Sequence, residues 1–332
     1  MEMEPSLEIE TILCTRILPH YNDIHRYCIC KVTKRMLTDY RSFYLCGLAG
    51  INPIGVVQVI RDILTLRRAL AGLPRPVGFV PTMGALHAGH LSLIRRARKD
   101  NPTVVVSIYL NPTQFNQPED LETYPSDLQR DLTLLQDEKV DVVFAPSHEE
   151  MYPAGFQVDR RWWPGRLAEV LEGRFRPGHF EGVITIVRRL FEAVRPDRAY
   201  FGQKDYQQWR IIERMAGDLF PGLQVIGLPT VRDDDGLALS SRNVRLSPQG
   251  RRRAALLPKA LSQAREAIEA DVPIPQAVQQ ARQMLEAAGV QVEYLEAVDP
   301  LTLEPVVEGN CLLCAAVYVE GVRLIDNVLV EK

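Results

Sequence analysis

The strongest constraint on the fold is a regular alternation of apolar runs and amphipathic segments between about residues 57 and 230. The apolar runs are rich in β-branched residues and are typical of buried strands; they cover residues 77–82, 103–112, 140–146, 198–202 and 223–230. The amphipathic segments predict helices over residues 57–72, 90–101, 126–140 (with Ser126 as N-cap), 182–194 and 206–219. Strands that alternate with helices of about 12 residues form βαβ units, so we expect a parallel sheet covered by helices.

The pattern changes past Val231. The chain then shows a polar, turn-rich segment, two helical patterns and two strand-like runs, over residues 232–247, 248–269, 275–288, 290–299 and 311–328, the last with a turn at a glycine. This order is typical of a small α+β domain. The sequence therefore predicts three parts: an atypical extension over 1–55, an α/β domain over 56–230 and a smaller α+β domain over 231–332.

Composition limits the class of protein. The 332 residues hold 39 Lys and Arg against 42 Asp and Glu, a net charge of −3, which argues against a dedicated nucleic-acid binder. No run of about 20 apolar residues indicates a membrane span, and the acidic start MEMEPSLEIE lacks the features of a secretory signal. Six cysteines in a chain of this length do not make a disulfide scaffold. We expect a cytoplasmic protein of enzyme size with reduced thiols.

The first 54 residues differ in composition from the rest. They hold four of the six cysteines, four of the eleven tyrosines and only one alanine, Ala49. One residue separates Cys28 from Cys30, whereas paired zinc ligands usually leave about two to four residues between them. We interpret the segment as an accessory extension. Two alternatives stay open: a bound metal, or an upstream translation artefact that places the working start near Val56 or Val57.

The clearest candidate site is PTMGALHAGH, residues 81–90, which leads from a buried strand through a glycine turn into a helix. A helix N-terminus offers free N–H groups and a positive dipole end to a phosphate, and Gly84 and Gly89 allow close approach. His87 and His90, three residues apart, could donate to phosphoryl oxygens as charge develops at the α-phosphorus. The alternatives are histidines that only cap the helix, or a metal-binding pair with a third ligand elsewhere.

Two further motifs could contact the same ligand. FGQKDYQQ, residues 201–208, ends a strand at Gly202, so Lys204 could contact phosphates, Asp205 ribose hydroxyls and Gln208 a polar substrate group. These residues would lie over the crevice that the histidines face, because both motifs follow strands of one parallel sheet. Taken alone, the motif is equally compatible with an ordinary capped helix start.

LSSRN, residues 239–243, opens the second domain with donors suited to an anion: Ser240, Ser241 and Arg242. A loop that closes over a triphosphate would exclude water and protect a reactive intermediate. A solvated loop without such a role is the alternative.

Uncharged and ionisable groups complete the candidate site. Asn111 and Gln114 in NPTQFN, residues 111–116, are suited to a substrate with hydroxyl groups and a carboxylate. LEGRFRPGHFEG, residues 171–182, adds Glu172, Arg174, Arg176 and His179, although Arg-Pro-Gly is also an ordinary turn.

Taken in order, PTMGALHAGH, NPTQFN, RPGHFEGVITIV with FGQKDYQQ, and DGLALSSRN resemble the pantothenate synthetase family, the pantoate–β-alanine ligases. The resemblance runs from about Val57 to the C-terminus. It implies an α/β fold in which a Rossmann-like ATP- and pantoate-binding domain is followed by a smaller α+β C-terminal lid domain. It also implies ATP-dependent ligation of (R)-pantoate and β-alanine to pantothenate, AMP and diphosphate through a pantoyl-adenylate, with Mg²⁺ on the ATP phosphates and a homodimer.

The resemblance also implies roles for individual residues. The proton-donor histidine falls on His90, with His87 and Lys204 beside it at the phosphates. The family's glutamine that binds both pantoate and β-alanine falls on Gln114, and its second pantoate-binding glutamine falls on Gln208. The ATP-binding residues fall on Met83, Gly84, Ala85, Leu86, His87, Ala88, Gly89, His90, Gly202, Gln203, Lys204, Asp205, Val231, Leu239, Ser240, Ser241 and Arg242. Gln203 stands where the family often has Glu, and no protein ligand of Mg²⁺ can be named.

Two other functions remain open. The His-x-Gly-His loop is similar to the signature of nucleotidyltransferases, so the chain could form a stable nucleotide-bearing product. The other alternative is a non-catalytic nucleotide-binding regulator, against which the intact catalytic motifs argue. The two glutamines and the Ser-Ser-Arg loop favour the ligase.

Three remaining features have ordinary interpretations. Cys311 and Cys314 have CxxC spacing but lie in a strand-like run, where residues i and i+3 point to opposite faces, so we expect core packing. We interpret Trp162 and Trp163 as packing or interface groups, and the run Arg251–Arg253 as a solvated helix start.

Overall fold

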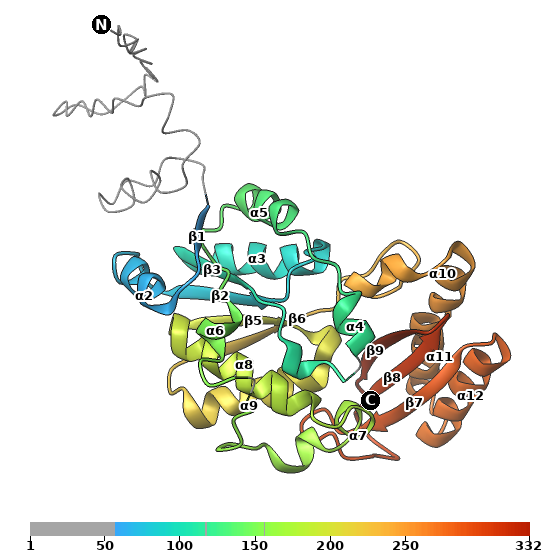
Figure 1. Cartoon of the computed structure of the whole chain (residues 1–332). Helices are drawn as coiled ribbons and strands as arrows, with labels where there is room; N and C mark the ends of the chain where they lie inside the picture. The colour runs from blue at the N-terminus through green and yellow to red at the C-terminus, as the bar shows by residue number, and fades with distance from the viewer. Residues whose placement is uncertain (1–56, 117, 156) are drawn as a thin grey trace, which may run out of the picture. The chain divides into compact units, whose positions relative to one another are not determined.

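Six parallel strands form the larger of two sheets in this computed structural model, which describes residues 57–116, 118–155 and 157–332. They lie in the order β1-β4-β3-β2-β5-β6 (Figure 1). The strands are β1 (Gln58–Ile60), β2 (Val77–Thr82), β3 (Thr103–Ile108), β4 (Val142–Phe144), β5 (Arg198–Gly202) and β6 (Gln224–Leu228). The chain reverses its direction across the sheet at β2, and β5 lies on the other side of β2 from β3. The loops after β2 and β5 therefore meet at one crevice, the usual ligand site of such sheets.

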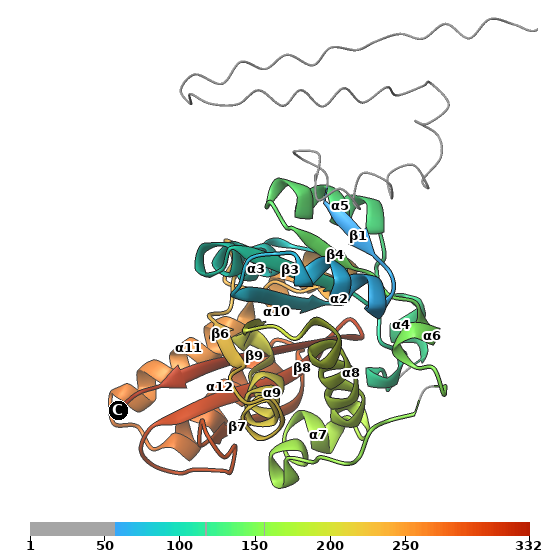
Figure 2. The same cartoon turned by 90° about the vertical axis from the view of Figure 1, so that its left-hand side faces the viewer.

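Helices cover both faces of this sheet (Figure 2). On one face lie α3 (Ala88–Asp100) and α5 (Leu128–Asp137), whose apolar side chains join a core cluster with β2, β3 and β4. On the other face lie α2 (Ile63–Ala71), α8 (His179–Val194) and α9 (Tyr206–Leu219). The short helices α4 (Pro118–Glu122), α6 (His148–Met151) and α7 (Glu172–Phe175) lie in the connections. This arrangement confirms the Rossmann-like prediction.

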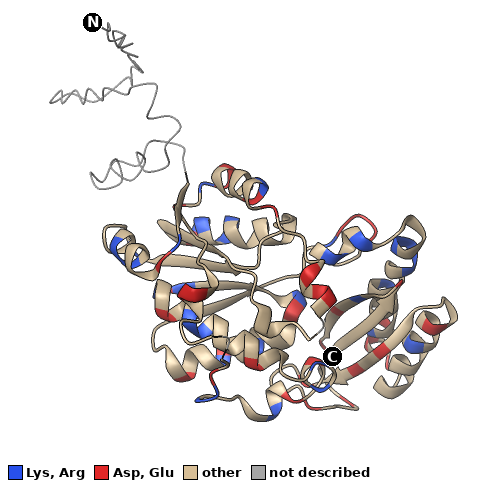
Figure 3. Ribbon diagram, viewed as in Figure 1, with Lys and Arg blue, Asp and Glu red and all other residues tan. Residues whose placement is uncertain are grey.

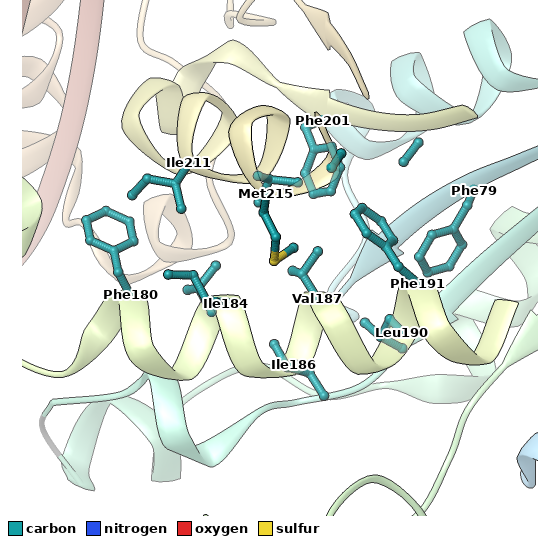
Figure 4. Packing of buried hydrophobic residues seen from close by; sticks show 14 of the residues in the cluster. Phe79, Phe180, Ile184, Ile186, Val187, Leu190, Phe191, Phe201, Ile211 and Met215 are labelled. Atoms are coloured by element: carbon teal, nitrogen blue, oxygen red, sulfur yellow. The ribbon is translucent and has the colours of Figure 1, made fainter. Parts of the chain in front are cut away.

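The longest helix among the described residues, α8, presents an almost continuous apolar surface to the sheet and to α9 (Figure 4). Phe191 packs edge-on against Phe79 of β2, with ring centroids 6.3 Å apart, and against Phe201 of β5 at 6.4 Å. Burying one such side chain stabilises the fold by about 1.5–3 kcal/mol. Because α8 begins at His179, this packing also fixes the residues at its first turn, next to the crevice.

The smaller sheet is antiparallel and consists of β7 (Gln291–Val298), β8 (Cys311–Val319) and β9 (Val322–Val330). Helices α11 (Leu256–Glu269) and α12 (Ile274–Ala287) pack on one face, and α10 (Pro248–Ala254) precedes them. The other face shares a hydrophobic cluster with α8 and α9. Cys311 faces the helices and Cys314 the opposite cluster, which confirms that the CxxC spacing gives two separate buried thiols.

Several expected boundaries are wrong. The predicted helix over 57–72 begins with strand β1, which pairs with β4, and α2 starts only after its N-cap Asp62. A strand of three residues is too short to show the pattern of apolar residues by which a strand is recognised in a sequence. The N-cap of α5 is Asp127 instead of Ser126, and β3 ends at Ile108 because Pro112 starts a 3₁₀ turn. The helix predicted over 248–269 is divided into α10 and α11 at Ala255.

The side chains noted for packing also find partners. Trp162 and Trp163 donate to Asp218 and Glu169, and Trp163 stays 40% exposed. The arginine run lies in the last turn of α10 rather than at a helix start, and two of its members are paired, Arg251 with Asp233 and Asp235 and Arg253 with Glu320. Residues Val57–Lys332 form one compact unit, and the predicted extension over 1–55 with its cysteines lies outside the described residues. No helix of the described part is long and apolar enough to cross a bilayer.

Candidate active site

The loop after β2 is folded around a buried carboxylate. Asp131 on α5 is 1% exposed, and its two oxygens accept the N–H groups of Ala85 and Leu86, each at 2.9 Å. Burial raises the pKa of Asp131, against the opposing effect of these two amides. Gly84 has φ +82°, and a Cβ there would lie 3.0 Å from Asp131 Oδ2, so this turn favours glycine. Ala85 and Leu86, which the resemblance places among the ATP-binding residues, therefore use their amides to fix the loop.

His87 and His90 cap helix α3 through their rings. His87 Nδ1 accepts the N–H of Gly89 at 3.2 Å, and His90 Nδ1 accepts the N–H of His87 at 3.3 Å, which is a capping box. An accepting Nδ1 carries no proton, so the proton of each neutral ring is on Nε2. Capping and ligand binding, which the sequence left as alternatives, are compatible, because each ring caps with one nitrogen and can donate with the other.

Both rings are neutral at physiological pH. Burial lowers the pKa of His87 to about 4, and Lys204 adds to the effect. Burial also lowers the pKa of His90 to about 3, followed by His87 and Lys204 as causes. The ring centroids are only 4.1 Å apart, so two charged rings would repel each other strongly. The pair can therefore offer two uncharged N–H donors.

Gln114 lies in the 3₁₀ turn η1 (Pro112–Gln114), after β3. Its Nε2 donates to Met83 Sδ at 2.8 Å, and its Oε1 accepts from Asn111 Nδ2 at 3.1 Å. Asn111 is 1% exposed and also donates to the carbonyl of Gly182 on α8. A Cβ at Gly182 would collide with the backbone of η1. This close approach of α8 fixes where the Gln114 side chain enters the site.

Lys204 lies in the turn η3 (Gln203–Asp205) between β5 and α9. Asn327 on β9 donates through Nδ2 to the carbonyls of Gln203 and Lys204, both at 2.9 Å. Lys204 Nζ lies 3.7 Å from a carboxylate oxygen of Asp205. The smaller sheet thus holds the backbone of the turn that presents the lysine.

The segment 231–245, called the flap below, carries the Ser-Ser-Arg sequence. Its base is held by a bidentate ion pair of Arg232 with Asp326, at 2.7 and 2.9 Å, and Asp326 directly precedes Asn327 on β9. Adjacent residues of one strand therefore hold both the flap and η3. The Oγ of Ser240 accepts the N–H of Arg242 and caps the 3₁₀ turn η4 (Ser241–Arg245).

The tip of the flap contacts α4, a helix rich in acidic residues (Figure 3). Arg242 donates to both oxygens of Asp120, at 3.2 and 2.6 Å, and Arg245 donates to the same carboxylate at 3.0 Å. Burial alone would raise the pKa of Asp120, but the two guanidinium groups outweigh it, so the pKa lies below its usual value. Ser241 Oγ donates to Tyr124 Oη at 3.3 Å.

One cavity brings the predicted groups together. Leu239 of the flap lies over the start of α3, so that a Cβ at Gly89 would be 3.9 Å from it. The predicted residues that line the cavity are Met83, His87, Gly89, His90, Gln114, Gly202, Lys204, Asp205, Gln208, Val231, Leu239, Ser240, Ser241 and Arg242. A single ligand can therefore touch the histidines and the flap at once. Five predicted residues do not line it: Gly84, Ala85, Leu86, Ala88 and Gln203.

Leu86 is fully buried, so its side chain acts through packing. Other residues of the site escaped the sequence analysis. Asp131, Asp120, Tyr124 and Asn327 hold the loops through partners far away in the chain, and no local pattern marks them.

Arg176 and His179 were noted in the sequence without a role, and both line the cavity. His179 Nδ1 lies 2.8 Å from the carbonyl of Gln114, and burial lowers its pKa to about 3. A neutral His179 thus supports the backbone of η1.

Metal binding by the protein alone is not supported. Among the described residues, no three His, Cys, Asp or Glu side chains are grouped so that they could hold an ion. Asp205 is the single acidic residue that the described chain places on the lining of the cavity. Mg²⁺ commonly binds to substrate phosphates with one or two carboxylates, and Asp205 fits that arrangement.

Comparisons with known proteins agree with this geometry. A family model described as pantoate-beta-alanine ligase matches residues 57–329. A pantothenate synthetase of Thermus thermophilus is 49% identical over 273 residues, covering 81% of this chain and 98% of the relative. The pantothenate synthetase of Fervidobacterium nodosum is 46% identical over 281 residues, covering 83% and 99%.

Two solved structures are similar over the same region. The Thermus thermophilus pantothenate synthetase matches with a TM-score of 0.78 at 46% identity, covering 83% of this chain and all of that one. The Francisella tularensis pantoate-beta-alanine ligase, complexed with beta-gamma ATP and beta-alanine, matches with a TM-score of 0.70 at 35% identity, covering 82% and 98%. The match of the family model and of these relatives, over nearly their whole length, shows that the chain belongs to the pantoate–β-alanine ligase family.

Proposed function

We propose that the cleft carries out the family's reaction, the ATP-dependent ligation of (R)-pantoate and β-alanine to pantothenate, AMP and diphosphate. The observation that carries this proposal is the single cavity lined by His87 and His90, by the flap hydroxyls and Arg242, and by two glutamines. The histidines and the flap suit a triphosphate, whereas Gln114 and Gln208 suit a small substrate with hydroxyl groups.

In the first step, a carboxylate oxygen of pantoate attacks the α-phosphorus of ATP, the bond to the β-phosphate oxygen breaks, and diphosphate leaves with that electron pair. His87 and His90 donate hydrogen bonds from Nε2 to phosphoryl oxygens as negative charge develops there. Lys204 and Arg242 add positive charge. Removing one such fixed donor typically costs about 2.7–4 kcal/mol of transition-state stabilisation.

Before ATP binds, His90 is a neutral donor, because a ring with a pKa of about 3 carries no second proton at neutral pH. The nearby charge of a bound triphosphate raises that pKa and strengthens the hydrogen bond. Attack of a carboxylate on the α-phosphorus needs no proton transfer. The imidazole can therefore act in adenylation as a hydrogen-bond donor that keeps its own proton.

In the second step, the unprotonated amine of β-alanine attacks the acyl carbon of the pantoyl-adenylate. The new C–N bond forms, the C–O bond to AMP breaks, and the amine loses a proton to solvent or to the departing phosphate. The flap limits the access of water to the adenylate, which would otherwise hydrolyse. We propose that Mg²⁺ accompanies ATP and would neutralise phosphate charge, and that Asp205, which lines the cavity, would supply a carboxylate ligand.

The test is isotope exchange between diphosphate and ATP, followed by AMP release. A ligase exchanges diphosphate into ATP only when pantoate is present, and it releases AMP stoichiometrically with pantothenate when β-alanine is added. A nucleotidyltransferase would accumulate a nucleotide-bearing product instead. A regulator would bind ATP and show neither reaction, and either of these results would overturn the proposal.

We also propose that the chain works as a cytoplasmic homodimer, with domains at 56–230 and 231–332 and an accessory extension at 1–55. The family resemblance and the change in composition support these assignments. Sedimentation of the purified protein tests the dimer, and cell fractionation tests the location. Intact mass spectrometry of the native protein shows whether the extension is present, and limited proteolysis tests the domain boundary near residue 230.

A further inference from the structure

Five cations of the described chain line the cleft and the two hollows beside it, and they differ in how well their charge is balanced. Lys204 lies near Asp205, Arg242 and Arg245 share Asp120, and Arg323 lies between Glu172 and Glu293. The fifth cation, Arg176, lines the cavity of the histidines and both neighbouring hollows. It therefore lies where the three spaces meet.

The partner of Arg176 is already engaged by stronger contacts. Glu172 receives two hydrogen bonds from Arg323, both at 2.7 Å, and one from the hydroxyl of Tyr294, also at 2.7 Å. Arg176 makes a single, longer contact of 3.2 Å with the same carboxylate. Of the two arginines that share Glu172, Arg176 is thus the less compensated, because Arg323 is also paired with Glu293. Burial lowers the pKa of Arg176, which agrees with a cation that lacks a full counter-charge.

The position of Arg176 links it to the substrate side of the cleft. Its Nη2 lies 3.4 Å from the carbonyl oxygen of Gln114, whose side chain we assign to the substrates. His179 holds the same carbonyl and is neutral, so it does not compete for an anion. A guanidinium in this place is well suited to a carboxylate, which it can bind through two parallel hydrogen bonds.

The chemistry of the proposed reaction decides which carboxylate this is. The carboxylate of pantoate is consumed when the adenylate forms, so it carries no charge in the second step. The amine of β-alanine must be unprotonated to attack. The carboxylate of β-alanine is then the one permanent charge on that substrate, and it remains in the product.

We propose that Arg176 binds the carboxylate of β-alanine and so selects an amino acid over a simple amine as the second substrate. This inference rests on the proposed ligase function. Glu172 and Arg323 act as positioning residues, because they hold the guanidinium in place and leave part of its charge for the ligand.

The experiment compares Arg176→Gln and Arg176→Lys with the full-length wild type in two assays. The pantoate-dependent exchange of diphosphate into ATP needs no β-alanine, so we expect it to change less than about threefold. Loss of a hydrogen-bonded charge costs about 1.5–3 kcal/mol, which corresponds to a rise of about 10- to 100-fold in the KM for β-alanine. Arg176→Lys keeps the positive charge but cannot form two parallel hydrogen bonds. Its KM for β-alanine should therefore lie between those of the wild type and Arg176→Gln.

A second readout separates recognition from a structural effect. The wild type should prefer β-alanine to propylamine, which has the same amine and chain length but no carboxylate, and Arg176→Gln should lose about 10- to 100-fold of that preference. The matched control is Arg174→Ala, which removes a charge from the helix that Arg176 caps, at a side chain that is 51% exposed and lines none of the three hollows.

Two outcomes would overturn the assignment. If exchange falls as much as ligation does, Arg176 acts on the phosphates; if the KM for β-alanine and the preference over propylamine both stay unchanged, Arg176 does not touch that substrate. Failure of the ligase function itself is distinct, because the wild type would then show no pantoate-dependent exchange at all.

Discussion

The two sides of the cleft are held by different kinds of interaction. On the sheet side, the buried Asp131 fixes the loop after β2, and His87 and His90 fix each other and the helix through a capping box. On the flap side, Arg242 is bound to Asp120 through side chains that are about a quarter exposed. A nucleotide could bind without disturbing the first set of contacts, whereas its phosphates would compete with Asp120 for Arg242.

This difference separates the groups that accelerate the reaction from those that bind the substrate. Donors that are neutral and already in place stabilise developing charge without reorganisation, so their effect is expected mainly in kcat. A cation that exchanges one anion for another gains only the difference between the two pairs, so its effect on affinity is modest. The predictions below test this division in order of expected size.

The largest effect is expected for His90→Ala, which removes a fixed donor from the sheet side. The kcat for AMP release should fall by about 100-fold or more, since one preorganised donor contributes about 2.7–4 kcal/mol. Loss of a helix cap costs only about 1 kcal/mol, so the variant should still fold. Thermal unfolding supplies the control for folding. Near-wild-type turnover in a folded variant would show that His90 is only a capping residue.

A smaller loss is expected for Asp131→Asn, which keeps the shape of the buried side chain. The amide can accept from only one of the N–H groups of Ala85 and Leu86, and it presents a donor to the other. We expect a loss of about 1–3 kcal/mol in stability and a fall in kcat of about 10-fold or more, because the histidines follow the loop. Asp137→Asn, which removes the same charge from an exposed position on the same helix, is the control. A variant that loses stability but keeps its kcat would uncouple the carboxylate from the histidines.

The contrast between groups that face the ligand and residues that hold them in place also explains what the sequence could predict. Strand β2 and helix α9 have the predicted bounds, because each is long enough to show the arrangement of apolar residues that is typical of its structure type. The histidines, Lys204 and the Ser-Ser-Arg sequence were found because they lie in contiguous motifs. Asp131 and Asn327 were missed, since each acts on a segment at least 45 residues away and neither stands in a recognisable pattern. Local sequence thus identifies the groups that face a ligand, whereas the residues that hold them in place follow only from tertiary packing.

An intermediate effect is expected for Asn327→Asp, which replaces the two donors of β9 by acceptors that face the carbonyls of η3. Lys204 should then lose its fixed position, and the KM for ATP should rise by about 10-fold, as is usual for the loss of a hydrogen bond that leaves polar groups unpaired. The KM for β-alanine should stay the same, which separates this effect from general unfolding. Asn310→Asp adds the same charge directly before β8, at a residue that accepts the N–H of Lys332, a role that a carboxylate can keep. An equal change in both KM values would contradict a specific role at the lysine turn.

The smallest effect, and the only one expected to favour the substrate, is that of Asp120→Asn on the flap side. Partly exposed ion pairs of this kind contribute about 0.2–1 kcal/mol, so freeing Arg242 from Asp120 should lower the KM for ATP by at most about fivefold. The difference from the wild type should shrink as salt is added, because salt screens the pair that the substitution removes. If the KM for ATP rises instead, the pair holds the flap in its binding position and does not compete with phosphate. In that case Asp120 belongs with Asp131 as a fixed support, and both sides of the cleft are preorganised.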